Sequence, residues 1–158
     1  MSEQYNVQFI NPILRAVLNV LSTMANVEVT PGKPYLNNNG LAVGDITGSV
    51  GIDGYAIGVI SLSLSKGVVL TIVNNMLYEN FTEINEEIAD AVGELTNMIS
   101  GQARSILSES DISFSAGTPK VIHGKGEKID HIPSVPVLAV PFSSSHGDLV
   151  VEIRLSNS

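Results

Sequence analysis

The segment LAVGDITGSVGIDGYAIGVISLSL, residues 41–64, predicts a β-hairpin. Two stretches rich in apolar and β-branched residues, Leu41–Ile52 and Tyr55–Leu64, flank Asp53-Gly54. An Asp-Gly pair in this setting is among the strongest hairpin signals, because both residues tolerate a positive φ. Glycine recurs through the segment without matching a phosphate-binding loop or a dinucleotide-binding fingerprint. We therefore interpret these glycines as bulges or as points of close packing.

Helical patterns lie on both sides of this hairpin. Residues 11–26 predict a first helix, since Asn11 is a good N-cap, Pro12 suits the first helical position and apolar residues then recur at helical spacing. An extended stretch is expected at residues 27–34, ahead of the hairpin. After the hairpin, Ser65 predicts the N-cap of a second helix.

The C-terminal half predicts more β-structure. Three stretches, Thr118–His123, Val135–Phe142 and Asp148–Leu155, are rich in β-forming residues, and a turn at residues 143–147 separates the last two. Each half of the chain thus has a helix, a Thr-Pro step and a pair of strands, which is a weak internal repeat. The expected fold is a single α+β domain, residues 1–158, in which an antiparallel sheet carries helices on one face. The last strand is a candidate edge strand.

Composition excludes several classes of function. The chain of 158 residues has 8 basic and 16 acidic side chains, a formal net charge of −8, and no cysteine. The excess of acid disfavours nucleic acid and anionic membrane surfaces as partners. Without cysteine there are no disulfides, no thiolate catalysis and no cysteine-bound zinc. Because no signal-peptide pattern and no membrane-spanning apolar run are visible, we expect a cytoplasmic protein.

A third helix, expected from Thr82 or Asn85 to about Ser108, has the most informative pattern. At 100° per residue its apolar residues form one stripe. That stripe consists of Ile84, Ile88, Val92, Leu95, Ile99, Ala103 and Ile106. A polar ridge points away from the core and consists of Asp90, Glu94, Asn97 and Gly101.

Two features of that ridge indicate a partner. Gly93 and Gly101 lie inside the helix, where each costs about 1 kcal/mol relative to alanine. With the small Ser100 beside them, they would flatten the ridge and let another backbone approach. Glu94 and Asn97, three residues apart, then project together. A carboxamide can orient a water molecule and a carboxylate can pair with a cation, so the pair predicts half of a site. Spacing alone also fits an ordinary solvated helix face.

The stretch Asp90–Ala103, with Glu94 and Asn97 as E-x-x-N, resembles the signature helix of the CheC/CheX/FliY phosphatases of bacterial chemotaxis. Other stretches resemble the CheX branch and extend the resemblance to about residues 5–155. These stretches are Phe9–Pro12, Pro31–Pro34, Gly44–Gly48 and Val135–Val137.

The resemblance implies that this chain dephosphorylates the phospho-aspartate of a response-regulator receiver, CheY in the simplest case. Glu94 would contact a lysine in the active site of the receiver, and Asn97 would position the attacking water. The docking surface would comprise Asp90, Gly93, Ser100 and Gly101. Since the receiver would supply the phosphorylated aspartate and its Mg²⁺, this chain would bind no cofactor or metal.

The resemblance also implies a homodimer and one site per chain. Some relatives have a second E-x-x-N in the first helix, whereas residues 11–26 contain no glutamate, and Ala16 precedes Asn19 by three positions.

Alternative functions follow from the same residues. A receiver-binding module that does not hydrolyse phosphate would use the same surface and would differ only in the role of Asn97. A structural component of the flagellar switch, like FliY, is less favoured because no additional domain is attached. His123 and His131 lie eight residues apart with basic residues between them, which disfavours a metal site. The absence of Gly-x-Ser-x-Gly disfavours a serine hydrolase.

Overall fold

One antiparallel sheet organises the chain. The computed structural model describes residues 7–37, 43–54, 56–124 and 137–157. The strands follow the order β1-β7-β8-β4-β3-β5, with β2 also pairing with β7 and β6 with β3. They are β1 (Thr30–Pro31), β2 (Tyr35–Asn37), β3 (Ile46–Gly54), β4 (Ala56–Leu64), β5 (Phe114–Ala116), β6 (Lys120–His123), β7 (Val137–Ser143) and β8 (Leu149–Asn157).

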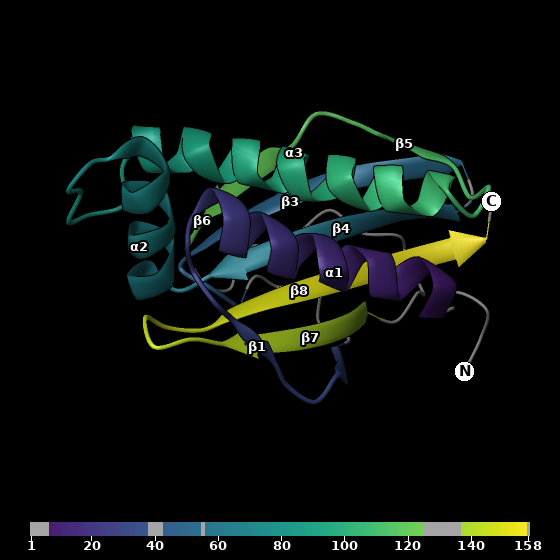
Figure 1. Cartoon of the computed structure of the whole chain (residues 1–158), viewed down its shortest axis with the longest axis horizontal. Helices are drawn as coiled ribbons and strands as arrows, with labels where there is room; N and C mark the ends of the chain where they lie inside the picture. Colours follow the sequence, from purple (N-terminus) through teal and green to yellow (C-terminus); the bar gives the residue numbers. More distant parts are fainter. Residues whose placement is uncertain (1–6, 38–42, 55, 125–136, 158) are drawn as a thin grey trace.

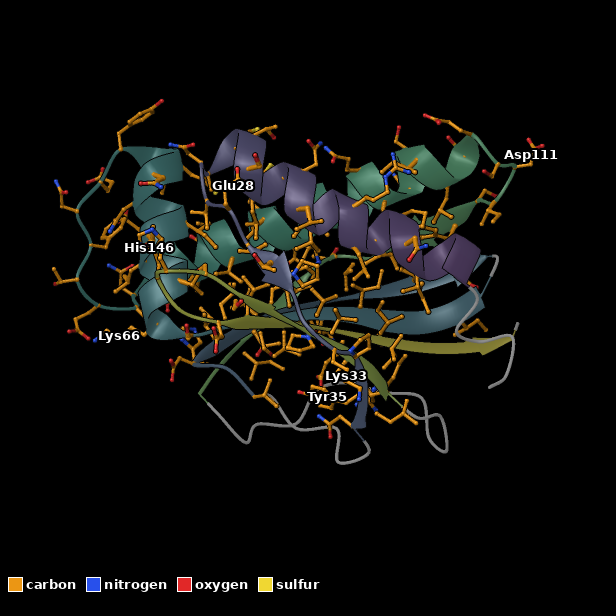
Figure 2. The ribbon with its side chains drawn as sticks, turned by 60° about the horizontal axis from the view of Figure 1, so that its bottom comes forward. Glu28, Lys33, Tyr35, Lys66, Asp111 and His146 are labelled. Atoms are coloured by element: carbon orange, nitrogen blue, oxygen red, sulfur yellow. The ribbon has the colours of Figure 1, made fainter. Side chains whose placement is uncertain are left out.

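The helices of the described part lie against this sheet. They are α1 (Val7–Met24), α2 (Lys66–Leu77) and α3 (Glu86–Ser108). Figure 1 shows α1 and α3 side by side across one face, with α2 at the end of the sheet where β4 finishes. The view in Figure 2 shows the same face covered by helices and Tyr35 on the other side of the sheet. The expected fold class, helices on one face of an antiparallel sheet, is therefore confirmed.

The topology repeats itself, as the weak sequence repeat suggested. The first half runs α1, β1, β2 and the hairpin β3–β4, and the second runs α3, β5, β6 and the hairpin β7–β8. The short strands of each half pair with the hairpin of the other half, since β1 and β2 join β7 while β5 and β6 join β3. The two halves meet where β4 pairs with β8 at the centre of the sheet. Helix α2 belongs to the first half alone.

The β3–β4 hairpin is confirmed, but the predicted two-residue turn is wrong. A turn at Asp53-Gly54 would pair Ile52 with Tyr55, whereas Ile52 pairs with Gly58. This register centres the connection on residue 55, which lies outside the described residues. Asp53 and Gly54 remain in β3 because they pair with Ser115 and Phe114 of β5. Gly54 still adopts a left-handed φ of 123°.

Helix α1 begins earlier than the predicted cap at Asn11. The helix starts at Val7, so Pro12 lies inside it. Burial of Ile10, which is 6% exposed, extends the apolar stripe by one turn and outweighs the local start signal. The helix ends at Met24 because Asn26 adopts φ 54°, a left-handed conformation that stops the helical hydrogen-bond pattern.

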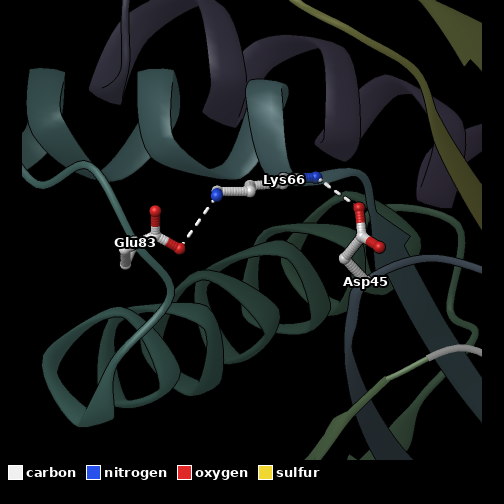
Figure 3. Close-up of polar contacts among 3 residues, drawn as sticks. All are labelled: Asp45, Lys66 and Glu83. Atoms are coloured by element: carbon white, nitrogen blue, oxygen red, sulfur yellow. Dashed lines mark hydrogen bonds and ion pairs between the residues drawn. The ribbon is translucent and has the colours of Figure 1, made fainter.

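Helix α2 begins where predicted, although a different residue caps it. Ser65 is the N-cap residue, yet its side chain makes no capping bond and its Oγ is buried without a partner. The backbone N–H of Lys66 donates instead to Asp45 Oδ2 at 2.7 Å (Figure 3). The same lysine reaches Glu83 through its Nζ at 2.8 Å. A carboxylate at this end also suits the helix dipole.

The sheet order overturns one prediction about its edges. Strand β8 is not at an edge, because it lies between β4 and β7. The sheet is bordered by short strands, two of which, β2 and β5, were not predicted as strands. The stretch Asn37–Gly40 has the composition of a turn, and it falls largely outside the described residues. A homodimer that extends the sheet would therefore have to use a short strand rather than β8.

Candidate functional site

Helix α3 presents the predicted pair. Asn85 is its N-cap, and the side chain accepts a hydrogen bond from Ile88 N at 2.9 Å, which decides between the two predicted starts. Most of the apolar stripe is buried in the core, with Val92 and Leu95 at 0% exposure, whereas Ile84 and Ile106 at its two ends are only half-buried. Asp90, Glu94 and Asn97 are exposed on the other side of the helix. The helical pattern alone thus placed these three side chains correctly.

A shallow depression lies beside the pair. Its volume is about 230 Å³, and it is lined by Ala89, Asp90, Gly93, Glu94, Asn97, Pro119 and Val121. Two carboxylates and one carboxamide contribute its polar groups, and its lining contains no cation. Such a surface fits a positively charged group of a partner, because unlike charges attract across a partly desolvated contact.

Neither helix glycine of the ridge is required by packing within the chain. A methyl group at Gly101 would meet no atom within 4 Å. At Gly93 it would lie 3.6 Å from Val121 Cγ2, an ordinary contact. Alanine would fit at both positions and would favour the helix by about 1 kcal/mol each. The flat surface therefore has no explanation in the fold of the described residues.

Ser100 does not contribute an exposed side chain. It is 3% exposed, and its Oγ donates to Asn97 O at 3.1 Å. The sequence predicted Ser100 as one of the small residues that let a partner approach, and that role stays a prediction.

Sequence reasoning missed the far wall of the depression. Pro119 and Val121 come from β6 and its approach, about 25 residues after the pair. The Thr118-Pro119 step had been noted only as part of the repeat. No local pattern in the sequence shows that β6 pairs with β3 and so lies beside α3. The internal repeat was the one sequence feature that could have placed Pro119 and Val121 near the pair.

A larger groove lies elsewhere, along α1. Its volume is about 800 Å³, and it lies between α1, β1 and the C-terminal part of α3. It contains Asn19, whose Nδ2 donates to Gln102 Oε1 at 2.5 Å. Ala16, the position where a second E-x-x-N would have its glutamate, is completely buried. The groove therefore has no second E-x-x-N on α1, despite its size.

The described part of the chain offers no evident metal centre. It contains no group of three or more His, Cys, Asp or Glu side chains that could hold a metal ion. His131 and most of the loop that follows His123 lie outside the described residues. Among the helices described, none has the length and apolarity needed to cross a membrane.

Comparison with known proteins identifies relatives. The family description "Chemotaxis phosphatase CheX" matches residues 46–143. A CheC-like superfamily protein from Shewanella sp. PV-4 is 43% identical, with a TM-score of 0.88 over 96% of this chain and 99% of that one. CheX from Desulfovibrio desulfuricans is 44% identical, with a TM-score of 0.85 over 94% and 99%. No curated protein matched the sequence.

A more distant structure contains a partner. The CheX of the CheX–CheY–BeF₃–Mg²⁺ complex from Borrelia burgdorferi is 25% identical to this chain. Its TM-score is 0.79, over 94% of this chain and 98% of the other. Together with the family match over most of the sheet and all of α3, these similarities show that the chain belongs to the CheX family of chemotaxis phosphatases.

Proposed function

We propose that this protein hydrolyses the aspartyl phosphate of a CheY-like receiver domain. One observation supports the proposal above all: Glu94 and Asn97 are exposed together beside a shallow, acidic depression. The depression is too open and too poor in catalytic groups to act by itself. A partner that carries the reactive phosphate would complete it.

Asn97 would act on the attacking water. In this hydrolysis the water oxygen bonds to phosphorus, the bond between phosphorus and the aspartate oxygen breaks, and the water proton passes to the phosphate. The products are inorganic phosphate and an aspartate carboxylate. A carboxamide neither gains nor loses a proton near pH 7, yet its oxygen can accept a hydrogen bond from the water and orient it. Catalysis by Asn97 would therefore come from positioning.

Glu94 and Asp90 would act on the receiver. Both carboxylates line the depression, and each can pair with a cation of the docked partner. Glu94 lies one turn from Asn97, so a lysine bound to it would hold the phosphate close to the carboxamide. Mg²⁺ would belong to the receiver and would neutralise charge on the phosphate.

The relatives support this choice of partner. The family is described as a chemotaxis phosphatase, and a CheX from Borrelia burgdorferi forms a complex with CheY. Gly93 and Gly101 support the same partner, because they leave room for a docked backbone that the described part of the chain does not use.

Release of inorganic phosphate from a phosphorylated receiver, with Mg²⁺ present, tests the proposal. The wild type should accelerate release, and Asn97→Ala should abolish the acceleration while receiver binding persists. Asn19→Ala is the matched control, since Asn19 is also an exposed helical asparagine but lies in the α1 groove. Its variant should remain active. If the wild type binds receivers of its organism without accelerating release, the protein is a binding module instead.

A further inference from the structure

Strand β3 passes unusually close to α3 at Gly48. A methyl group added to Gly48 would lie 2.1 Å from Thr96 Oγ1, 3.1 Å from Val92 Cγ1 and 3.3 Å from Thr96 Cβ. Thr96 is 3% exposed, and its Oγ1 donates to Val92 O at 2.8 Å. Only glycine at position 48 therefore lets the helix lie at its present height above the sheet.

This contact lies directly beneath the candidate site. Thr96 immediately precedes Asn97 and follows Glu94 by two residues, so all three share one turn of α3. In the sheet, Gly48 pairs with Val121 of β6. Val121 lines the depression and faces Gly93 across it. Gly48 thus lies beneath the helix that bears the pair and beside the strand that forms the far wall.

We propose that Gly48 and Thr96 are positioning residues that set the height of α3, and hence the position of Asn97, relative to a docked receiver. The proposal rests on the proposed phosphatase function for its kinetic consequence. The displacement of the helix itself follows from the packing alone. Neither residue would touch the phosphate or the water.

A methyl at position 48 can be accommodated in two ways, and both disturb α3 at Thr96. Rotation of Thr96 about its Cα–Cβ bond removes Oγ1 from the contact but leaves Cβ and the Val92 methyl in place, both closer than 3.4 Å. That rotation also breaks the bond from Thr96 Oγ1 to Val92 O, and the contacts that remain still require a shift of a few tenths of an ångström. If Thr96 keeps its rotamer, the helix must retreat by more than 1 Å to bring the 2.1 Å contact to an ordinary 3.4 Å. A misplacement of about 1 Å in a positioned catalytic group can cost roughly a hundredfold in rate.

The test uses Gly48→Ala in the phosphate-release assay. Its kcat should fall by up to roughly a hundredfold, and its KM for the phosphorylated receiver should rise by a smaller factor because Glu94 moves with the helix. Adding Thr96→Ala, which removes the atom in closest contact, should restore most of the lost kcat. Gly51→Ala is the matched control on the same strand, because its methyl would meet only Gly58 O at 3.9 Å. The control should behave as wild type.

A variant of the helix side covers the case in which Gly48→Ala does not fold. Thr96→Val keeps the shape of the side chain and should keep kcat, whereas Thr96→Ile lengthens it above Gly48 and should lower kcat. Equal kcat values for these two variants would overturn the proposal. A folded Gly48→Ala with the kinetics of Gly51→Ala would do the same.

Two measurements separate this proposal from the proposed function. Comparison of the wild type with Asn97→Ala decides whether the protein is a phosphatase. A crystal structure of Gly48→Ala decides whether α3 moves away from β3. If the helix has not moved, the positioning proposal fails even if the protein is an active phosphatase. If the wild type is inactive, a displaced helix still supports the packing argument, and the catalytic consequence is refuted.

Discussion

Replacement of Gly101 by alanine should stabilise the free protein and weaken its docking. Gly101 lies in the interior of α3, seven residues before its end, and a methyl there meets nothing within 4 Å. The gain is therefore the intrinsic preference of the helix for alanine over glycine, about 1 kcal/mol. For a chain of this size, that gain corresponds to a rise in Tm of roughly 2–4 °C.

The assay combines thermal unfolding with receiver binding. Gly67→Ala, in the first turn of α2, is an informative contrast, because its methyl would lie 2.4 Å from the backbone oxygen of His146. Overpacking of this kind typically costs about 1–3 kcal/mol, so Gly67→Ala should lower Tm. The two substitutions are chemically identical, and only their surroundings differ.

Gly101→Ala should also bind the phosphorylated receiver more weakly than the wild type, because the methyl stands on the flat ridge beside Asn97. A Tm that does not rise would refute the claim that the fold leaves this position free. A rise in Tm with unchanged receiver affinity would refute the claim that the glycine serves docking. Both results come from one purified variant, so stability and docking are tested independently.

Two further predictions concern the frame around the site. Asp45→Ala removes the side chain that caps α2 and should lower the free energy of unfolding by about 1 kcal/mol in urea denaturation. Glu83→Gln breaks only the exposed ion pair to Lys66 and should lower the free energy of unfolding by much less. Burial raises the pKa of Glu152, although the hydrogen bond from Asn37 and the nearby charge of Arg154 both act to lower it. The contribution of Glu152 to the free energy of unfolding is therefore complete below the ordinary pKa of a glutamate, and it is lost as pH rises through the raised pKa. Urea denaturation of the wild type and of Glu152→Gln should be compared from just below the ordinary pKa of a glutamate upward. The wild type should lose stability relative to the variant as pH increases, and parallel curves would contradict this.

Much of the candidate site was predictable because its chemistry lies on one helix. The positions of Asp90, Glu94 and Asn97 relative to the apolar stripe follow from a period of 3.6 residues, which is a local property of the chain. The cap at Asn85 follows from the same local rules, and the structure confirms it. The antiparallel sheet and its helical face likewise followed from two helix-plus-hairpin halves.

Wrong predictions share a different origin. Ser65 occupies the N-cap position as predicted, but the expected capping bond is made by Asp45, twenty positions earlier, and not by the serine side chain. Asp53-Gly54 has the composition of a tight turn, but pairing with β5 keeps both residues in a strand. In each case a segment distant in sequence offered a better partner than the neighbouring residue did.

The sequence by itself determined which side chains α3 presents, because helical geometry relates residues three and four apart wherever the helix lies. Only the tertiary structure decided what stands beside them: Val121 as the far wall, Ser100 turned into the protein and Gly48 beneath Thr96. These contacts join segments tens of residues apart, and no local periodicity specifies them. They depend on strand order and on how closely a helix can pack on a sheet, which is fixed only when the core is filled.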